Sequence, residues 1–216
     1  MRRTPEQAEQ TRLKVIDAGL RLFSQSGYSG TTLAMIAKEA GMSRGPIYWH
    51  FENKDELFEA VIAYSQTPLQ RLVDAARADT PDPVARMSAF IQGWFDLLVS
   101  DKRHRQSFEI LMNKTELTQR MARTVRRERE LTRAIITLFE SLVDDARAQE
   151  LLPAGDPADL LALQTYTYLM GVTQTWLFSP RLFSLRKHKD YFHRKCLATL
   201  FDNAATVLHP GNTGSG

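Results

Sequence analysis

Residues 32–54 read TLAMIAKEAGMSRGPIYWHFENK, and this stretch decides the fold of the first part of the chain. The apolar side chains of its first half recur at the i, i+3, i+4 and i+7 spacing of one helix face. Thr32 stands before this face as an N-cap, and Gly41 follows it, where a left-handed C-cap position favours a residue without a Cβ. Ser43 can cap a new helix two residues later. The pattern predicts two short helices around a glycine turn, a helix-turn-helix.

The second helix of this pair begins with Arg44 and carries aromatic side chains on its open side. Ile47 and Phe51 are four residues apart and are expected to point inward. In a helix-turn-helix, the second helix enters the major groove of DNA with its N-terminal residues nearest the bases. We therefore expect Arg44 to contact a base edge. The candidate DNA-binding residues are Thr32, Ser43, Arg44, Gly45, Tyr48, Trp49, His50 and Lys54.

Two residues of this stretch oppose helix formation, and contact with DNA explains both. Gly45 costs about 1 kcal/mol of helix propensity relative to Ala, which a close approach of the backbone to the sugar-phosphate chain would justify. Lys54 follows the N-cap Asn53, and a cation in a first turn opposes the helix macrodipole unless a phosphate binds there. A helical hairpin with a glycine turn also occurs inside all-helical cores, so spacing alone leaves both interpretations open.

Length and composition allow a small domain followed by a larger one. The chain has 216 residues, of which 43% are hydrophobic and 25% are charged, as in globular proteins. No run of 18 apolar residues predicts a membrane span, and the N-terminus lacks the apolar core of a signal peptide. We therefore expect a cytoplasmic protein without a membrane partner. The single cysteine, Cys196, lies in an apolar helical pattern that favours a buried thiol over a reactive one.

The net charge is modest, at +3 with an isoelectric point near 9.1. A weakly basic total is compatible with a dimer that places a few cations on DNA, and it argues against non-specific coating of nucleic acid. A run of arginines from Arg120 to Arg133 is interrupted by glutamates. This run favours a solvated helix face over a second DNA site.

Helix start signals recur along the chain, whereas alternating strand patterns do not. A capping box, TPEQ at residues 4–7, opens a first helix that runs to about Gln25. Asp-Pro pairs at residues 82–83 and 156–157 open two later helices, and a long helix is expected from about Leu117 to Glu150. The sequence predicts an all-α fold of about nine helices. The expected domains are a helix-turn-helix domain at 1–56 (motif about 32–51), a helical bundle at 57–210 and a disordered tail at 211–216.

The second domain is rich in large aromatic and methionine side chains. Such a lining inside a helical bundle can bind flat hydrophobic molecules of varied shape. For any single one of these residues, ordinary core packing is the favoured interpretation. Polar side chains among them can orient a ligand. The candidate ligand-binding residues are Phe90, Trp94, Phe108, Glu109, Met112, Phe139, Tyr166, Met170 and Gln174.

The segment TRLKVIDAGLRLFSQSGYSGTTLAMIAKEAGMSRGPIYWHFENKDELFEAVI, residues 11–62, resembles the N-terminal domain of TetR-family transcriptional regulators along its whole length. The family's pattern is matched at closely spaced positions. These positions are Ala18, Leu22, Phe23, Gly27, Thr32, Ile36, Ala37, Ala40, Gly41, Ser43, Tyr48, Phe51, Lys54 and Leu57. The resemblance implies a DNA-binding regulator.

The later part of the chain resembles the ligand domain of AcrR-type repressors of multidrug efflux pumps. RQSFEILMNKTELTQRM at 105–121 and GVTQTWLFSPRLFSL at 171–185 carry this resemblance. It implies a homodimer on a palindromic double-stranded DNA operator that leaves when a hydrophobic small-molecule inducer binds. The AcrR-like pattern has a glutamate where this chain has Gln66, which puts a preference for cationic drugs in doubt.

Dimerisation is also expected from geometry. One recognition helix reads too few base pairs for a genomic operator, whereas a symmetric pair reads half-sites about 34 to 36 Å apart. The last two helices have apolar faces wide enough for both a core and a partner. These faces include Leu160, Leu163, Phe192, Ala204 and Leu208.

An enzyme is the competing class of function. The histidines His104, His188, His193 and His209 lack metal-ligand spacing, and the chain has no nucleophile elbow and no Walker loop. We expect no catalytic residue, no metal and no cofactor. A TetR-type regulator of lipid or signal-molecule metabolism with an acyl effector would share every N-terminal feature, so that alternative stays open.

Overall fold

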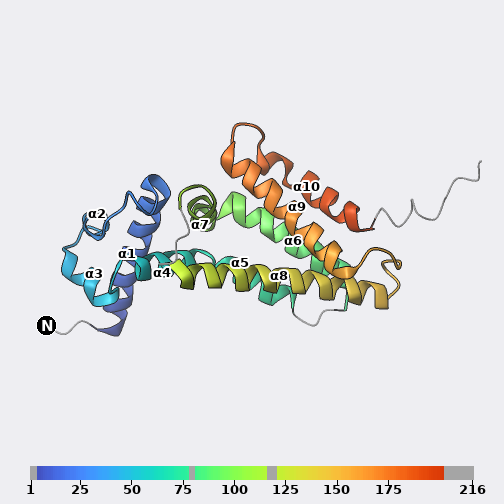
Figure 1. Cartoon of the computed structure of the whole chain (residues 1–216), viewed down its shortest axis with the longest axis horizontal. Coiled ribbons are helices and arrows are strands. Elements are labelled where there is room, and N and C mark those ends of the chain that lie inside the picture. Colours follow the sequence, from blue (N-terminus) through green and yellow to red (C-terminus); the bar gives the residue numbers. More distant parts are fainter. Residues whose placement is uncertain (1–3, 78–80, 116–120, 202–216) are drawn as a thin grey trace, which may run out of the picture. The chain divides into compact units, whose positions relative to one another are not determined.

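The computed structural model describes residues 4–77, 81–115 and 121–201, and every regular element longer than one turn in these ranges is an α-helix (Figure 1). The all-α prediction is therefore confirmed. The ten helices of the described ranges are α1 (Pro5–Ser26), α2 (Leu33–Glu39), α3 (Arg44–His50), α4 (Lys54–Ser65), α5 (Thr67–Ala76), α6 (Pro83–Ser100), α7 (Lys102–Asn113), α8 (Ala122–Ala148), α9 (Ala158–Phe178) and α10 (Leu185–Phe201).

The chain divides into two compact units that do not follow the sequence order. The first unit contains Met1–Leu69 and Asp101–Glu130, and the second contains Gln70–Ser100 and Leu131–Gly216. The boundaries fall inside α5, between α6 and α7, and inside α8. The predicted functional division after residue 56 stays a prediction.

Helix α1 begins and ends at the predicted signals. The Thr4 hydroxyl accepts a hydrogen bond from the Gln7 amide at 3.3 Å, and the Gln7 side chain accepts one from the Thr4 amide at 3.1 Å. Pro5 occupies the first turn, which needs no amide donor. At the C-terminus Gly27 has a φ of 72°, and its amide donates to the Phe23 carbonyl at 3.0 Å. Local capping chemistry therefore fixes both ends of α1.

The core of the first unit lies around α1, which packs against α2, α3, α4 and α7. The rings of Phe23 and Tyr28 each meet the ring of Phe58 edge-on, with centroids 5.2 Å apart in both pairs. Edge-to-face packing adds to the free energy gained by burying the rings. The two short helices α2 and α3 therefore pack against a core that contains these aromatic rings.

The described ranges contain one more helix than the approximate count expected for the whole chain from the sequence. Residues 54–76 form two consecutive helices, with Gln66 as the C-cap of α4. Pro68 lacks an amide donor and its ring would clash with the carbonyl four residues earlier, so α4 cannot run through it. Pro68 instead lies in the first turn of α5.

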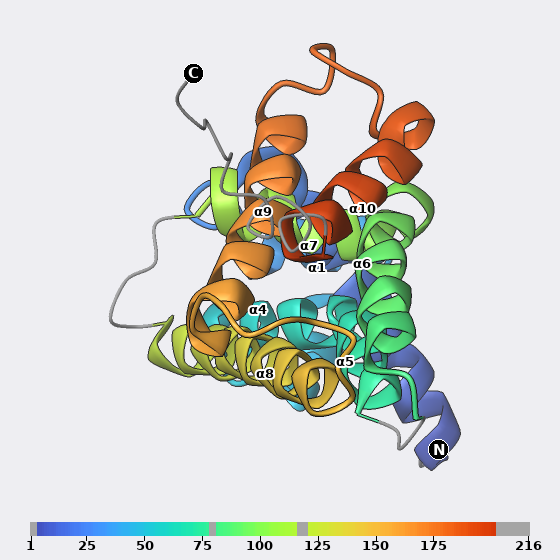
Figure 2. The same cartoon turned by 90° about the vertical axis from the view of Figure 1, so that its right-hand side faces the viewer.

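The second unit has its core between α6, α9 and α10, which lie beside one another in Figure 2. The Trp94 indole donates to the Thr173 hydroxyl at 3.0 Å and joins α6 to α9. Cys196 is fully buried on α10, and burial raises the pKa of its thiol to about 12. The prediction of a buried structural thiol is confirmed.

The two Asp-Pro helix starts differ. The Asp82 carboxylate accepts from the Ala85 amide at 2.9 Å and caps α6 as predicted. The predicted cap of α9 is wrong, because Pro157 itself is the N-cap residue and no side chain caps the helix.

Several expectations concern residues outside the described ranges. These are the start of the long helix at Leu117, Arg120, the apolar residues Ala204 and Leu208, His209 and the tail at 211–216. Within the described ranges, no helix combines the length and apolar character needed to cross a bilayer.

Candidate DNA-binding surface and ligand-binding residues

The turn between α2 and α3 is closed by backbone hydrogen bonds. Gly41 has a φ of 68°, its amide donates to the Lys38 carbonyl at 3.1 Å, and the Met42 amide donates to the Ala37 carbonyl at 3.0 Å. This left-handed closure of α2 is the one predicted for a glycine at this place. Ser43 is the N-cap residue of α3, but its side chain makes no capping hydrogen bond. The position of Ser43 is confirmed, whereas capping by its hydroxyl is not observed.

Helix α3 separates an anchored side from an exposed side. Ile47 is fully buried and Phe51 is 2% exposed, whereas Tyr48 is 57% exposed and Trp49 is 68% exposed. Arg44 is also exposed at the first position of the helix. The inward and outward directions predicted from spacing are therefore observed. Contact of the exposed side with DNA stays a prediction.

The remaining candidates on this surface have specific neighbours. The Thr32 hydroxyl accepts from the Met35 amide at 3.2 Å, so it caps α2 as predicted. His50 is half-buried, and its ring lies edge-on to that of Trp49 with centroids 4.6 Å apart. Arg21 on α1 pairs with Glu39 on α2 at 2.7 Å. These contacts orient the two short helices of the motif.

Lys54 has a structural role that the sequence did not indicate. Its ammonium donates to the Tyr28 and Thr31 carbonyl oxygens, each at 2.9 Å, and lies 4.0 Å from the centroid of the Tyr28 ring. Burial lowers the pKa of Lys54, and the Asp55 carboxylate acts in the opposite direction. The cation that opposes the dipole of α4 is thus compensated within the protein, without a phosphate. Its role toward DNA stays a prediction.

We expect Lys54→Met to lower the free energy of unfolding by about 1 to 2 kcal/mol, because two carbonyls lose a charged donor while the alkyl stem is kept. Thermal unfolding followed by circular dichroism measures this change. Lys38→Met, at an exposed position on α2, is the matched control and should change stability little. Equal stability of both variants would contradict the structural role of Lys54.

Gly45 lies on the exposed side of α3, and a Cβ added there would meet no atom within 4 Å. Gly45→Ala should therefore stabilise the free protein by up to about 1 kcal/mol through helix propensity. If the backbone approaches the sugar-phosphate chain here, the same variant should bind operator DNA several-fold more weakly. Fluorescence anisotropy with a labelled operator measures binding. A variant that is more stable and binds DNA as tightly as the original would exclude close approach at Gly45.

Three of the candidate ligand residues, Phe108, Glu109 and Met112, lie on α7 in the first unit. The Phe108 ring is buried and lies edge-on to that of His104, with centroids 5.1 Å apart. Glu109 is 3.9 Å from Arg105 on the same helix, and Met112 is half-buried. The contacts of Phe108 and Glu109 within this unit are with neighbouring residues of α7, and the ligand role of the three residues stays a prediction.

Helix α7 is held firmly against α1 and α4. Arg103 pairs with Asp17 at 3.0 Å, and Gln106 donates to the Ser24 hydroxyl at 3.1 Å. The Nδ1 atom of His104 lies 3.3 Å from the Ser65 carbonyl oxygen. Burial lowers the pKa of His104, whereas this hydrogen bond and the Asp101 carboxylate raise it. Burial is the largest of these causes, so the net shift in the pKa of His104 is downward, which favours the neutral imidazole.

The other six candidates lie in the second unit, where four aromatic rings form a chain of contacts. The ring of Phe139 meets that of Phe90 edge-on with centroids 5.0 Å apart, and Trp94 meets Tyr166 at 6.4 Å. The Tyr166 hydroxyl is 3.0 Å from the Thr132 hydroxyl. Met170 and Gln174 are half-buried on α9. Four of the six candidates therefore contact one another, and the ligand role of all six stays a prediction.

An apolar pocket of about 360 Å³ lies between α5 and the start of α6. Its lining is Leu72, Ala75, Ala76, Pro81, Asp82, Ala85, Arg86, Ala89 and Phe90. Of the candidate ligand residues, Phe90 contributes to this lining. The residues predicted from the sequence are mostly large side chains, whereas four alanines, Ala75, Ala76, Ala85 and Ala89, contribute to this lining. The signal that would have found this pocket is the repeated alanines on the facing helices.

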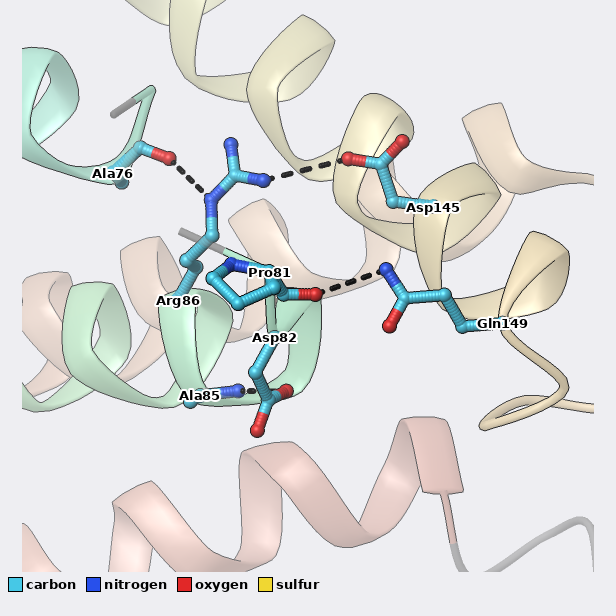
Figure 3. A network of polar contacts seen from close by, with 7 residues as sticks. All are labelled: Ala76, Pro81, Asp82, Ala85, Arg86, Asp145 and Gln149. Atoms are coloured by element: carbon cyan, nitrogen blue, oxygen red, sulfur yellow. Dashed lines mark hydrogen bonds and ion pairs between the residues drawn. The ribbon is translucent and has the colours of Figure 1, made fainter. Parts of the chain in front are cut away.

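Polar contacts join residues that line this pocket to the α8 region, and Figure 3 shows this network. Arg86 donates from Nε to the Ala76 carbonyl at 3.0 Å and reaches the Asp145 carboxylate at 3.5 Å. The Gln149 side chain donates to the Pro81 carbonyl at 2.9 Å. These contacts connect the end of α5 and the residues around the start of α6 with the last turns of α8 and the residue just after it, all within the second unit.

In the ranges 4–77, 81–115 and 121–201, no group of three or more histidine, cysteine or acidic side chains is arranged to hold a metal ion. The arginines of the early part of α8 that the structure describes there, Arg123, Arg126, Arg127 and Arg129, are exposed. Arg123 pairs with Glu59 at 2.9 Å. This arrangement agrees with the solvated helix face predicted from the sequence.

Two sequence profiles match most of the chain. The profile described as "Bacterial regulatory proteins, tetR family" matches residues 15–61. The profile described as "MAATS-type transcriptional repressor, C-terminal region" matches residues 82–201. The first covers the helix-turn-helix, and the second covers α6 to α10.

Similar proteins of known sequence and structure are bacterial regulators. The HTH-type transcriptional regulator AcrR of Shigella flexneri is 33% identical over 192 residues, which cover 88% of this chain and 89% of AcrR. TtgR of Pseudomonas putida is 35% identical over 184 residues, which cover 83% and 86% of the two chains. The crystal structure of NalD, the secondary repressor of the MexAB-OprM multidrug efflux pump in Pseudomonas aeruginosa, superposes with a TM-score of 0.79 at 26% identity, covering 91% of this chain and 98% of NalD.

Proposed function

Because the chain belongs to the TetR family of bacterial transcriptional regulators, we propose that it is a homodimeric repressor that a hydrophobic small molecule releases from a palindromic operator. We further propose that the controlled operon encodes a multidrug efflux pump. The observation that carries this proposal is the exposed side of α3, with Tyr48 and Trp49 extended from a helix that Ile47 and Phe51 anchor. Membership of the family makes the chain a DNA-binding regulator rather than an enzyme.

Arg44 is the residue to which we assign base recognition. It is exposed at the N-terminal end of α3, where residues of a recognition helix lie nearest the bases. An arginine there can donate two hydrogen bonds to a guanine edge. Tyr48 follows one turn later and would contact a thymine methyl group or a phosphate. Residues 1–56 would form the DNA-binding domain and residues 57–210 the domain for ligand binding and dimerisation, in the cytoplasm where the operator is accessible.

The proposal of efflux control is supported by the relatives. NalD is a repressor of a multidrug efflux pump, and SmeT, which superposes with a TM-score of 0.76 at 26% identity, has been solved as a complex with triclosan. A regulator of fatty acid metabolism from Clostridium perfringens also superposes, but at 20% identity it shows the fold alone. Aromatic and apolar linings in the second unit suit a hydrophobic inducer.

Exposed apolar side chains on α9 support dimerisation. Leu160 is 54% exposed, Leu163 is 45% exposed and Phe178 is 77% exposed. Large apolar side chains gathered on one helix of a soluble regulator are typical of an interface. A second copy of the chain would cover them and would place two α3 helices on successive turns of DNA.

The test of this function is operator release. The purified chain should bind a labelled fragment from upstream of its own gene as a dimer, and a hydrophobic drug such as triclosan should lower its affinity for that fragment. Release requires that the drug bind the DNA-free conformation more tightly, since equal affinity for both states shifts nothing. Binding of the fragment without any effect of hydrophobic drugs would exclude the efflux version and favour an acyl or other effector.

A further inference from the structure

Positive charge is concentrated in the segment before α10 and in the first part of that helix. Residues 181–195 contain six lysine or arginine side chains and one acidic side chain, Asp190, so their formal net charge is +5. The net charge of the whole chain is +3, so the rest of the chain is slightly acidic in sum. Residues 181–195 therefore create a local positive potential, which attracts anionic partners.

One side of α10 is occupied by its contacts with α6. The Lys189 ammonium pairs with the Asp96 carboxylate. The Nε2 atom of His193 lies 2.9 Å from the Ser88 hydroxyl oxygen. Cys196 is fully buried on the same side of the helix. These contacts determine which side of α10 faces the rest of the second unit.

The opposite side of α10 carries a row of exposed cations. Lys187, Arg194 and Lys195 are exposed, and spacings of seven and eight residues place them on one face of the helix. Tyr191 lies between them, one turn after Lys187, and is 51% exposed. In the part of the chain that the structure describes, none of the three cations forms an ion pair. We call Lys187, Tyr191, Arg194 and Lys195 the basic stripe.

An exposed apolar side chain and a further cation precede the basic stripe. Leu182 is 69% exposed, and the neighbouring Arg181 is exposed as well. The Leu182 amide donates to the Ser179 carbonyl oxygen at 2.9 Å, so these residues lie in a hydrogen-bonded turn. Figure 2 shows the segment between α9 and α10 as a loop that extends beyond the ends of both helices. Arg181 and Leu182 are therefore accessible to a large partner.

The combination of cations with exposed apolar groups distinguishes among anionic partners. Phosphates of DNA are bound by cations and polar groups, and an exposed leucine gains nothing from them. A second copy of the chain related by a twofold axis pairs a surface patch with itself, which would bring like charges together. A bilayer with anionic lipids offers negative headgroups and, below them, an apolar boundary that accepts leucine and tyrosine side chains.

We propose that the basic stripe, together with Arg181 and Leu182, binds the surface of a bilayer that contains anionic lipids. The four cations contact lipid headgroups, while Leu182 and Tyr191 enter the boundary between headgroups and acyl chains. Such a contact lies at the membrane surface and needs no spanning helix. This inference goes beyond the proposed function, because it assigns a partner to a surface that operator and inducer binding do not use.

Co-sedimentation of the full chain with lipid vesicles tests this proposal. One set of vesicles contains phosphatidylcholine alone, and the other contains phosphatidylcholine and phosphatidylglycerol in a ratio of about two to one. We expect the chain to partition onto the anionic vesicles at least about tenfold more strongly than onto the neutral ones. This preference should decrease as salt is added, because salt screens the attraction between cations and headgroups.

The variant Lys187→Gln, Arg194→Gln and Lys195→Gln removes the three cations of the basic stripe from exposed positions. Each cation near an anionic bilayer contributes about 1 kcal/mol, or about fivefold, so the triple variant should partition about a hundredfold more weakly. The matched control is the triple change of Arg126, Arg127 and Arg129 to Gln, which removes the same charge from exposed positions on α8. The control should bind anionic vesicles within about twofold of the original chain.

Leu182→Ser tests the apolar part of the contact. It should weaken binding to anionic vesicles about fivefold and leave the salt dependence of binding unchanged, since apolar burial adds to the electrostatic attraction.

Three results would overturn the proposal. The first is equal binding, or none, to the two kinds of vesicle by the original chain, a comparison that needs no variant. The second is an equal loss of vesicle binding in the two triple variants. The third is a basic-stripe variant that binds vesicles as before but loses affinity for polyglutamate or for a duplex without operator sequence, or that changes its mass in solution. That result would assign the stripe to a protein, to nucleic acid or to a second copy of the chain.

Discussion

Gly27→Ala should lower the free energy of unfolding by about 3 kcal/mol or more, because strain and a steric clash act together. Gly27 has φ 72° and ψ 174°, a backbone conformation that is essentially restricted to glycine. A Cβ there would lie 2.8 Å from the carbonyl oxygen of Lys114, a backbone atom at the end of α7. The contacts of α7 with α1, including Arg103 with Asp17 at 3.0 Å, resist a shift of that carbonyl.

Gly41→Ala is the matched control for this effect. Gly41 also has a positive φ, 68°, but an added Cβ would meet no atom within 4 Å. Its cost should therefore be the conformational one alone, about 1 kcal/mol. Chemical unfolding of both variants, monitored by circular dichroism, separates the cost of the backbone conformation from the cost of the steric clash. Equal destabilisation of the two variants would show that the carbonyl oxygen of Lys114 does not obstruct a Cβ at position 27.

Arg44→Ala should weaken operator binding by about 1 to 3 kcal/mol and relax base preference at one position of each half-site. The fold should be unaffected, since Arg44 is exposed and α3 is anchored by Ile47 and Phe51. Binding of a set of operators with single base changes, measured by competition, gives both the affinity and the preference. Unchanged preference in the variant would reassign base recognition to another residue.

The control for Arg44→Ala is Arg126→Ala, which removes the same charge from an exposed position on α8. If the arginines of α8 form a solvated face, this variant should bind every operator nearly as well as the original chain. A loss of affinity comparable to that of Arg44→Ala would instead support a second DNA contact on α8.

Local signals in the sequence were sufficient for the helix-turn-helix. Thr4, Thr32 and Asn53 each cap a helix through a side chain that reaches an amide three residues later. Such bonds depend on adjacent residues, so the sequence alone predicts them. The inward position of Ile47 and the exposure of Tyr48 follow from helix periodicity in the same way.

Features that depend on contacts distant in sequence were not predictable. The carbonyl oxygens that accept hydrogen bonds from the Lys54 ammonium belong to residues more than 20 positions earlier. The residue spacing of α4 does not indicate these partners. The hydrogen bond from the Gln66 side chain to the Glu128 carboxylate spans 62 residues. The pocket beside Arg86 depends on the space left by alanines of two different helices. The resemblance to a family indicated a ligand domain, but only packing reveals which side chains meet.

The most direct test of the account is a footprint of the purified chain on the DNA upstream of its own gene, with its mass in solution measured at the same concentration. We predict a dimer that protects two symmetric half-sites with centres about 34 to 36 Å apart, and a loss of this protection in Arg44→Ala. A monomer, or a dimer that protects no site on this DNA, would contradict the central claim that paired α3 helices read an operator.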